Sequence, residues 1–230
     1  MKYFAYGSNC NAAIMKRKGV EFTSRERATL RGYRLKFNKK SLRDALPDSI
    51  GFANINVDPE GVVEGVLYEI IDAHREILDE SERYPDHYDR IIVEVETDNG
   101  LHECSAYQAQ PDKIAEGLVP SRNYLNHILT ARDFLSQQYF DALDKSATYS
   151  GECACCHVTG EVFFLKEFEQ MYTLCQSCRE ARIVWGDVRG RRLSVPETEA
   201  VMSGLVANGG GFPSLQALVE EAITLKLIDP

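Results

Sequence analysis

The first part of the chain alternates apolar and polar residues with a period of two, and these runs are rich in β-branched and aromatic side chains. Such runs, bounded by turn residues, are typical of β-strands. Their close spacing favours a mixed or antiparallel sheet, such as a small barrel, over repeated βαβ units. The pattern predicts strands at residues 28–37, 51–55, 62–71, 88–97 and 101–108. Turns are predicted at residues 58–61 and 98–100, the second within a hairpin.

Helical periodicity is confined to fewer segments. Apolar residues recur at helical spacing in residues 11–18, 121–134 and 136–143. Asp72 is a candidate cap for a short helix that ends near Asp79. Nearer the end of the chain, residues 197–207 are expected to be helical, and Ser214 is expected to cap a further helix after the glycines at 209–211.

The composition is that of an ordinary globular protein. The chain has 230 residues, 44% of them hydrophobic, and a formal net charge of −9. This acidic balance makes general nucleic-acid binding unlikely on electrostatic grounds, since phosphate contacts need clustered Lys and Arg. No apolar stretch is long enough to span a bilayer, and the first residues lack the apolar core of a signal peptide. We therefore expect a cytoplasmic protein with no membrane segment.

A boundary is expected at residues 147–151, where small and polar residues separate the last helix of the first part from a cysteine cluster. This predicts two domains, 1–147 and 148–230. The fold class expected is α+β, with a mixed β-barrel surrounded by helices and a small zinc-stapled C-terminal domain. A stable second domain of this size would need such a staple, because its apolar content is low.

The cysteines in the second domain have the spacing of a metal site. Cys153 and Cys156 form one C-x-x-C knuckle, and Cys175 and Cys178 form another. Two such knuckles bring four thiolates onto one tetrahedral ion, which predicts a structural Zn²⁺ with no open catalytic position. Cys155 or His157 could replace a ligand of the first knuckle. Reduced cysteines without a metal, or a redox pair, are the alternatives; the isolated Cys10 and Cys104 are expected to be buried.

Basic residues lie beside the second knuckle, where zinc modules sometimes bind nucleic acid. Acidic residues are interleaved with them, and Trp185 is the one large stacking surface nearby. We therefore expect a surface for a protein partner or a homodimer in this domain. The basic residues are Arg179, Arg182, Arg189, Arg191 and Arg192.

The strongest candidate chemistry lies at the N-terminus, where Tyr6-Gly7-Ser8-Asn9 follows the apolar run Tyr3-Phe4-Ala5. A strand that ends in such a turn presents backbone N–H groups that can hold a carboxylate or an oxyanion. Gly-Ser-Asn most often forms a turn and nothing more. A carboxylic acid elsewhere in the chain would be needed for proton transfer.

Several segments, in order, resemble the γ-glutamylcyclotransferase-like family over roughly the first 145 residues. Any one of these segments is a weak signal, and together they are fairly specific. One departure is visible, since the family often has Gly directly after its catalytic glutamate and this chain has Arg83. The segments are Tyr3–Asn9, Gly51–Ile55, Glu64–Tyr68, Leu78–Glu82, Tyr88 and Pro120–Tyr124.

The resemblance implies a barrel with a pocket at one end and an enzyme that cyclises a γ-glutamyl group to 5-oxoproline, releasing an amine or amino acid. It implies Glu82 as general acid and base, and no cofactor for catalysis. A solvated acid in the charged run 79–82 is the alternative for Glu82. The resemblance also implies a small-molecule γ-glutamyl substrate, bound by Tyr3, Phe4, Ala5, Tyr6, Gly7, Ser8, Asn9, Tyr88 and Tyr124.

Three other functions use the same residues. A γ-glutamylamine cyclotransferase, or a deprotecting acyltransferase that acts on a γ-glutamylated intermediate, would differ only in the amine that leaves. A non-catalytic barrel that binds a ligand, with the zinc module docking a partner, belongs to another class. Arg83 is expected to reshape the mouth of the pocket or to favour a substrate with an anionic tail.

Overall fold

A computed structural model of the chain describes residues 1–42, 45–167, 170–180, 182 and 193–207, with side chains up to residue 202. The chain divides into two compact units, Met1–Thr148 and Tyr149–Pro230, which are described separately. Among the described residues, no helix combines the length and apolar character needed to cross a bilayer.

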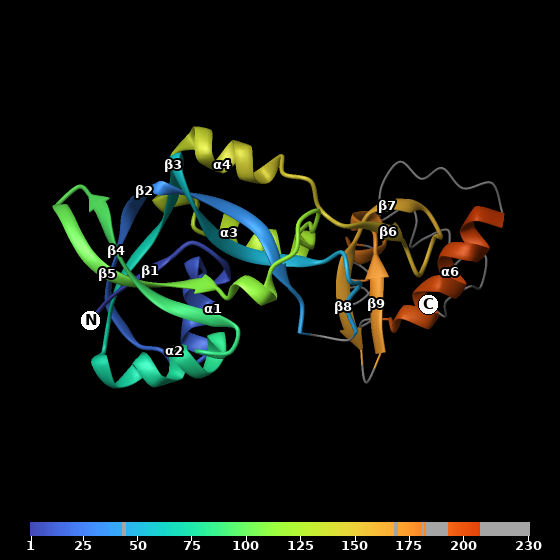
Figure 1. Cartoon of the computed structure of the whole chain (residues 1–230). Coiled ribbons are helices and arrows are strands. Elements are labelled where there is room, and N and C mark those ends of the chain that lie inside the picture. The colour runs from blue at the N-terminus through green and yellow to red at the C-terminus, as the bar shows by residue number, and fades with distance from the viewer. Residues whose placement is uncertain (43–44, 168–169, 181, 183–192, 208–230) are drawn as a thin grey trace. The chain divides into compact units, whose positions relative to one another are not determined.

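Five strands of the first unit close into a barrel in the order β1-β3-β2-β4-β5 (Figure 1). The contacts between neighbours are antiparallel except where Tyr3 of β1 pairs with Ser105 of β5 in parallel. Side chains on both faces of these strands are fully buried, among them Phe4, Val66 and Tyr68. The strands are β1 (Lys2–Ala5), β2 (Phe22–Lys40), β3 (Gly51–Ile70), β4 (Tyr88–Thr97) and β5 (Gly100–Ala109).

The turn predicted at residues 58–61 is wrong, because β3 continues through these residues and joins two of the predicted strands. Arg31 of β2 pairs with Val62, but Tyr33 pairs with Val57, so the extra residues of β3 lie opposite Gly32. Gly32 has a φ of +78°. An irregularity of this kind bends both strands together, which lets long strands follow the wall of a barrel. The Pro and Gly of this segment therefore mark a bulge and not a chain reversal.

The hairpin predicted at residues 98–100 is confirmed. Thr97 of β4 pairs with Gly100 of β5, which leaves a two-residue loop between the strands. Gly100 has a φ of +113°, a backbone conformation that glycine adopts without a steric penalty.

Helices surround the barrel, and three of them begin at side-chain caps. Asn11 caps α1 (Ala12–Arg17), Ser121 caps α3 (Arg122–Leu129) and Ser136 caps α4 (Gln137–Asp144); each cap is the first residue of a segment predicted to be helical. The segment expected to be one helix at 121–134 breaks after α3 into a separate 3₁₀ turn, η4 (Arg132–Phe134). The other 3₁₀ turns are η1 (Ser8–Cys10), η2 (Asp72–His74) and η3 (Pro111–Lys113).

The short helix expected near Asp72 is present as α2 (Arg75–Glu82), preceded by η2, but Asp72 is not its cap. No side chain caps either element. The Asp72 carboxylate instead accepts a hydrogen bond from the N-terminal ammonium of Met1 at 2.6 Å. The opposite charge of the chain terminus competes successfully for this carboxylate, and the terminus is close only because β1 and β3 pair.

Arg83 ends α2 in the left-handed conformation, with φ 53° and ψ 46°. Its amide and that of Tyr84 donate to the carbonyls of Glu80 and Asp79, at 3.1 and 2.9 Å. Glycine is the usual residue at this position of a helix end, because other residues pay a steric cost there. This geometry explains why a glycine would fit directly after the glutamate. In this chain an arginine adopts the left-handed conformation instead.

Arg83→Gly is accordingly expected to raise the free energy of unfolding by about 1 kcal/mol, because it removes the left-handed strain of a residue with a Cβ. Chemical denaturation of the two proteins measures the difference. Arg83→Ala is the matched control, since it removes the side chain and keeps the strain. Equal stability of the glycine and alanine variants would show that the conformation carries no cost.

The described part of the second unit includes two small sheets, helical residues at 176–180 and a long helix near the end of the described chain. β6 (Ser150–Glu152) pairs with β7 (Thr159–Glu161), and β8 (Phe163–Glu167) pairs with β9 (Gln170–Leu174). The helix predicted at 197–207 is confirmed as α6 (Val195–Ala207). Ser194 and Glu197 exchange side-chain and backbone hydrogen bonds in a capping box, for which a Ser followed three residues later by a Glu is the typical pattern. The glycine break and the helix expected after Ser214 lie outside the described residues.

Candidate active site and cysteine cluster

The turn after β1 is held rigidly by the barrel. Its 3₁₀ geometry is closed by the amides of Cys10 and Asn11, which donate to the carbonyls of Gly7 and Ser8 at 3.0 and 3.1 Å. Tyr68, buried on β3, donates from its hydroxyl to the carbonyls of Asn9 and Cys10 at 2.9 and 3.1 Å. Among the described residues, no backbone carbonyl accepts from the amides of Gly7, Ser8 or Asn9. The Ser8 amide interacts with the hydroxyl of Tyr124, and the amides of Gly7 and Asn9 are available to a ligand.

Gly7 is required by the packing of this turn. A Cβ at this position would lie 3.0 Å from the Tyr124 hydroxyl and 3.2 Å from the Cβ of Ala53. The turn, the start of β3 and α3 consequently approach one another more closely than a larger residue would permit.

Glu82, the last residue of α2, lies beside the turn. Its Oε1 accepts from the side-chain amide of Asn9 at 3.0 Å and from the ammonium of Lys18 at 2.9 Å. Ser81 also approaches Oε1, at 3.4 Å, whereas no described residue bonds Oε2. The side chain is 18% exposed. One oxygen is thus anchored and the other is free to exchange a proton with a ligand.

Lys18 is a contact that the sequence pattern did not reveal. Besides Glu82, its ammonium donates to Asn9 Oδ1 at 2.8 Å and to Ser81 Oγ at 3.0 Å. It therefore joins the turn to the end of α2. A lysine just after a helix resembles any surface lysine, and only the fold brings it to the acid.

Five tyrosines surround Glu82 and the turn. Asn9 donates to the Tyr3 hydroxyl at 2.8 Å, Tyr88 donates to the carbonyl of Ala53 at 2.9 Å, and the amide of Ala53 donates to Tyr124 at 3.1 Å. Burial raises the pKa of Tyr3, Tyr88 and Tyr124 well above the usual value, and the negative charge of Glu82 adds to the effect. These phenols therefore remain protonated and act as neutral hydrogen-bonding groups. The other two tyrosines are Tyr6 and Tyr107.

The side chains enclose a cavity of about 30 Å³ with Glu82 as the one acidic residue in its lining. All the residues that the resemblance implied for the site lie in this lining except Phe4 and Ala5, which are buried in the barrel core. Alternation along β1 explains the exception for Phe4, which lies on the face of the strand opposite to Tyr3. Two lining residues, Ala53 and Tyr107, were not expected; nothing in their local sequence distinguishes them. The lining comprises Tyr3, Tyr6, Gly7, Ser8, Asn9, Ala53, Glu82, Tyr88, Tyr107 and Tyr124.

A larger hollow of about 640 Å³ opens between β2 and the β4–β5 hairpin. It shares no residue with the cavity at Glu82 and is more open to solvent. Its lining includes exposed side chains such as Ile92 and Leu101, both 64% exposed. Size alone does not make this hollow a reaction site, because it lacks a buried acid or nucleophile.

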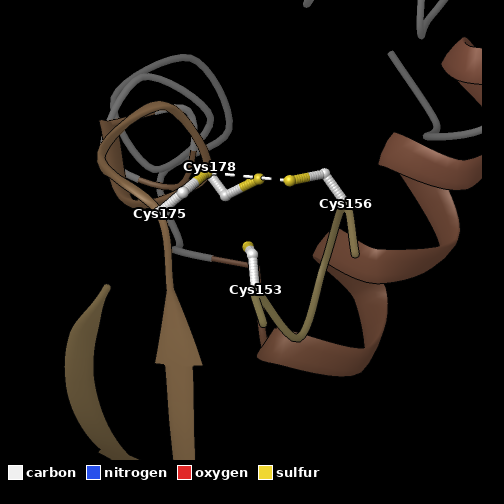
Figure 2. A group of neighbouring side chains, drawn as sticks. All are labelled: Cys153, Cys156, Cys175 and Cys178. Atoms are coloured by element: carbon white, nitrogen blue, oxygen red, sulfur yellow. Dashed lines mark hydrogen bonds between the residues drawn. The ribbon is translucent and has the colours of Figure 1, made fainter. Parts of the chain in front are cut away.

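In the second unit, Cys153, Cys156, Cys175 and Cys178 point toward one another from two segments (Figure 2). All four sulfur atoms lie within 4.8 Å of one another, and those of Cys156 and Cys175 are 3.7 Å apart. A tetrahedral ion with Zn–S bonds of about 2.3 Å requires sulfur atoms about 3.8 Å apart. The cluster can hold a metal ion, and its dimensions fit a zinc-ribbon-like module.

Neither alternative ligand belongs to this cluster. The sulfur of Cys155 faces the carbonyl of Val195, at 3.8 Å, and borders the sulfur atoms of Cys153 and Cys178 without being one of the four that lie mutually close. His157 is 55% exposed, and its Nδ1 lies 2.8 Å from a carboxylate oxygen of Glu152. The pKa of His157 is raised, mainly by this hydrogen bond, which holds the ring away from the sulfur atoms.

The expected basic surface is only partly described. Arg182 is 8% exposed and donates to the carbonyl of Leu193 at 2.8 Å and to Glu167 at 2.6 Å. It is thus an internal structural residue and cannot contact nucleic acid. Arg179 lies over the ring of Phe163, and the other three arginines of the group lie outside the described residues.

A closed barrel, a Gly-Ser-Asn turn and a carboxylate beside it define a barrel protein of the cyclotransferase-like class. The family model for gamma-glutamyl cyclotransferase, AIG2-like, matches residues 3–126, which is more than half of the sequence. The chain therefore belongs to the gamma-glutamyl cyclotransferase, AIG2-like family.

Solved structures agree with this assignment. The chain is similar to a protein described as gamma-glutamyl cyclotransferase, with 25% identity and a TM-score of 0.57 over 66% of this chain and 92% of the other. It is also similar to the uncharacterized human protein loc79017, with 27% identity and a TM-score of 0.56 over 66% and 91% of the two chains.

A third similar structure is YkqA from Bacillus subtilis, with 25% identity and a TM-score of 0.55 over 63% of this chain and about half, 53%, of YkqA. A search of curated proteins finds no match. The family and these neighbours support a cyclotransferase-type activity for the first unit.

Proposed function

We propose that the first unit cyclises a γ-glutamyl group to 5-oxoproline and releases an amine or amino acid, with Glu82 as general base and then general acid. The observation that carries this proposal is the carboxylate of Glu82, anchored through Oε1 by Asn9 and Lys18 and free at Oε2. Membership of the family supports the same reaction.

The nucleophile in this reaction belongs to the substrate. Glu82 accepts a proton from the α-ammonium of the γ-glutamyl group, and the resulting amine attacks the γ-carbonyl carbon. The new C–N bond closes the five-membered ring and places negative charge on the carbonyl oxygen. The bond to the leaving nitrogen then breaks as Glu82 returns the proton to that nitrogen. The ring nitrogen, positively charged after the attack, loses its second proton to the released amine, which leaves as an ammonium. Atoms and protons balance without water or any cofactor.

The turn supplies the second half of the proposed site. Its amides at Gly7 and Asn9 are suited to hold the substrate carboxylate or the developing oxyanion. When the γ-glutamyl group is held in a bent conformation, its amine lies close enough to its γ-carbonyl to react. This proximity lowers the activation barrier for ring closure. A cavity of about 30 Å³ admits roughly one water molecule. Side chains at its mouth, Lys18 first among them, must therefore move when the substrate enters.

The experiment that tests this function is a panel of γ-glutamyl amino acids, γ-glutamyl amines and glutathione, assayed for 5-oxoproline by mass spectrometry. Release from at least one class of donor is the expected result. The member turned over fastest distinguishes an amino-acid-releasing from an amine-releasing enzyme. Ligand binding with no 5-oxoproline from any donor would support a non-catalytic barrel.

For the second unit we propose one structural Zn²⁺ held by Cys153, Cys156, Cys175 and Cys178. The sulfur separations support four thiolate ligands, which leave no open position on the metal. Three of the residues in the small core around the cluster are themselves buried cysteines. A metal would therefore supply much of the free energy that stabilises this unit.

A further inference from the structure

Cationic side chains gather around Lys39, next to the ring of Tyr88. Lys39 stands near the end of β2, where it forms a bridge with Ile114. The amide of His87 donates to the carbonyl of Arg83 at 2.9 Å, so the segment after α2 turns back toward the start of β4. Lys40 donates to the carbonyl of Asp112 at 2.7 Å, which joins η3 to the same place. The fold thereby collects Lys39, Lys40, Arg83, His87 and Lys113, of which Lys113 pairs with the carboxylate of Asp112 at 2.5 Å and His87 lies near Asp86.

Lys39 is the most unusual member of this cationic cluster, because it is 3% exposed. Its ammonium donates to the carbonyl of Lys40 at 2.7 Å and lies 5.6 Å from the ring centroid of Tyr88. No described carboxylate pairs with it, although buried charges are ordinarily paired. Burial lowers its pKa to about 8; the negative charge of Glu82, which forms no ion pair with it, opposes the shift, and the positive charges of Arg83, Lys113 and Lys40 add to it.

His87 and Arg83 add unpaired polar groups at the same place. Nδ1 of His87 is buried and has no hydrogen-bond partner among the described residues. Burial and the charges of Lys39, Lys113 and Arg83 lower the pKa of this imidazole, so it is neutral at pH values near 7 and carries one N–H donor. Arg83 is exposed and has no ion pair within the described part of the chain.

A purely structural role does not explain the cationic cluster. A solvated basic face is common on proteins, but it does not bury a lysine without an acid, and the chain as a whole carries a net charge of −9. The cluster adjoins the proposed active site, because the ring of Tyr88 borders both Lys39 and the cavity at Glu82. The missing partner is an anion that is present when the site is occupied.

We propose that Lys39, Arg83 and His87 bind a carboxylate on the leaving group of the substrate. This inference rests on the proposed function and narrows it: the released product is an amino acid or peptide with a free carboxylate, and not a neutral or cationic amine. The γ-glutamyl end would occupy the turn and Glu82, while the leaving group extends past Tyr88 to the cationic cluster.

The test compares γ-glutamylalanine with γ-glutamylalaninamide, which differ only in the charge of the leaving group. The full-length protein is expected to show a kcat/KM about tenfold higher for the acid, corresponding to one charge-assisted hydrogen bond. Arg83→Gln removes the charge, keeps a non-glycine residue in the left-handed conformation, and is expected to remove most of this preference. Arg83→Lys should restore part of it.

Arg75→Gln, an exposed change on α2, is the matched control and should leave the preference intact. Equal turnover of acid and amide by the unaltered protein would overturn the inference while leaving the proposed function in place. So would an equal loss for both donors in Arg83→Gln, which would indicate a structural effect. Release of 5-oxoproline from neither donor, or from any other γ-glutamyl compound, would overturn the proposed function and the inference with it.

A pH series gives a second readout. Lys39 faces Glu82 and Arg83 from the end of α2, Lys113 from η3, and Lys40 from its own strand. Because its pKa is lowered to about 8, Lys39 loses its charge in the free enzyme as the pH rises past that value. The substrate α-amine is common to both donors, so the ratio of their kcat/KM values isolates the subsite. This ratio is expected to fall between pH about 7 and about 9; a constant ratio would contradict a role for Lys39.

Discussion

Glu82→Gln is expected to lower 5-oxoproline release by about 10²–10⁴-fold and to leave the fold intact. The amide keeps the size of the side chain and an oxygen for the hydrogen bonds that Asn9 and Lys18 donate. It has no basic oxygen to take a proton from the substrate ammonium. Steady-state release from the best donor of the panel measures the loss, and circular dichroism checks the fold.

Glu80→Gln is the matched control, because Glu80 lies on the same helix two residues away and is exposed. This variant should turn over within about twofold of the unaltered protein, as surface substitutions generally do. Normal turnover by Glu82→Gln would remove Glu82 from the reaction. A comparable loss in both variants would indicate that activity depends on the total negative charge of α2 and not on proton transfer by Glu82.

Loss of zinc is the second change with a large expected effect. Cys156→Ser is expected to abolish stoichiometric zinc binding and to expose the amides of β6 to β9 to hydrogen exchange, since the metal replaces a large apolar core in this unit. Exchange in the barrel strands should be unchanged. Elemental analysis and hydrogen exchange measured by mass spectrometry give the two readouts.

The neighbouring Cys155→Ser is the control, because the sulfur of Cys155 faces the carbonyl of Val195 and lies outside the four-sulfur group. It should retain about one zinc per chain. Protein purified without chelator that contains no zinc would contradict the proposed metal. Retention of zinc by Cys156→Ser and its loss from Cys155→Ser would show that the first knuckle uses the other cysteine.

Local rules predicted the parts of the fold that depend on a few neighbouring residues. The helical segments predicted to begin at Asn11, Ser121 and Ser136 form helices, and each of these residues caps its helix with a side-chain oxygen near the first free amides. The hairpin at 98–100 follows from its turn residues alone. Predictions failed where distant chain segments intervene, as at Asp72, whose carboxylate binds the ammonium of Met1.

The candidate site likewise contains residues that the sequence indicated and residues that only the fold brings together. The turn and Glu82 stand out in the sequence as motifs, and the fold brings them within 3.0 Å through Asn9. Lys18, Tyr107 and Lys39 carry no local signal, since an isolated lysine or tyrosine has the same appearance on any surface or in any core. Arg83 was visible as a departure, but only the backbone shows that it occupies a left-handed position.

The most direct test of the central claim is the fate of the substrate amine. γ-Glutamylalanine and its N-acetyl derivative are incubated with the protein in ¹⁸O-labelled water, and the products are identified by mass spectrometry. If the substrate amine is the nucleophile, the free-amine donor yields 5-oxoproline without enzymatic incorporation of ¹⁸O, and the N-acetyl donor yields no product. Glutamate that carries ¹⁸O, or cleavage of the N-acetyl donor, would show hydrolysis by water and contradict intramolecular cyclisation.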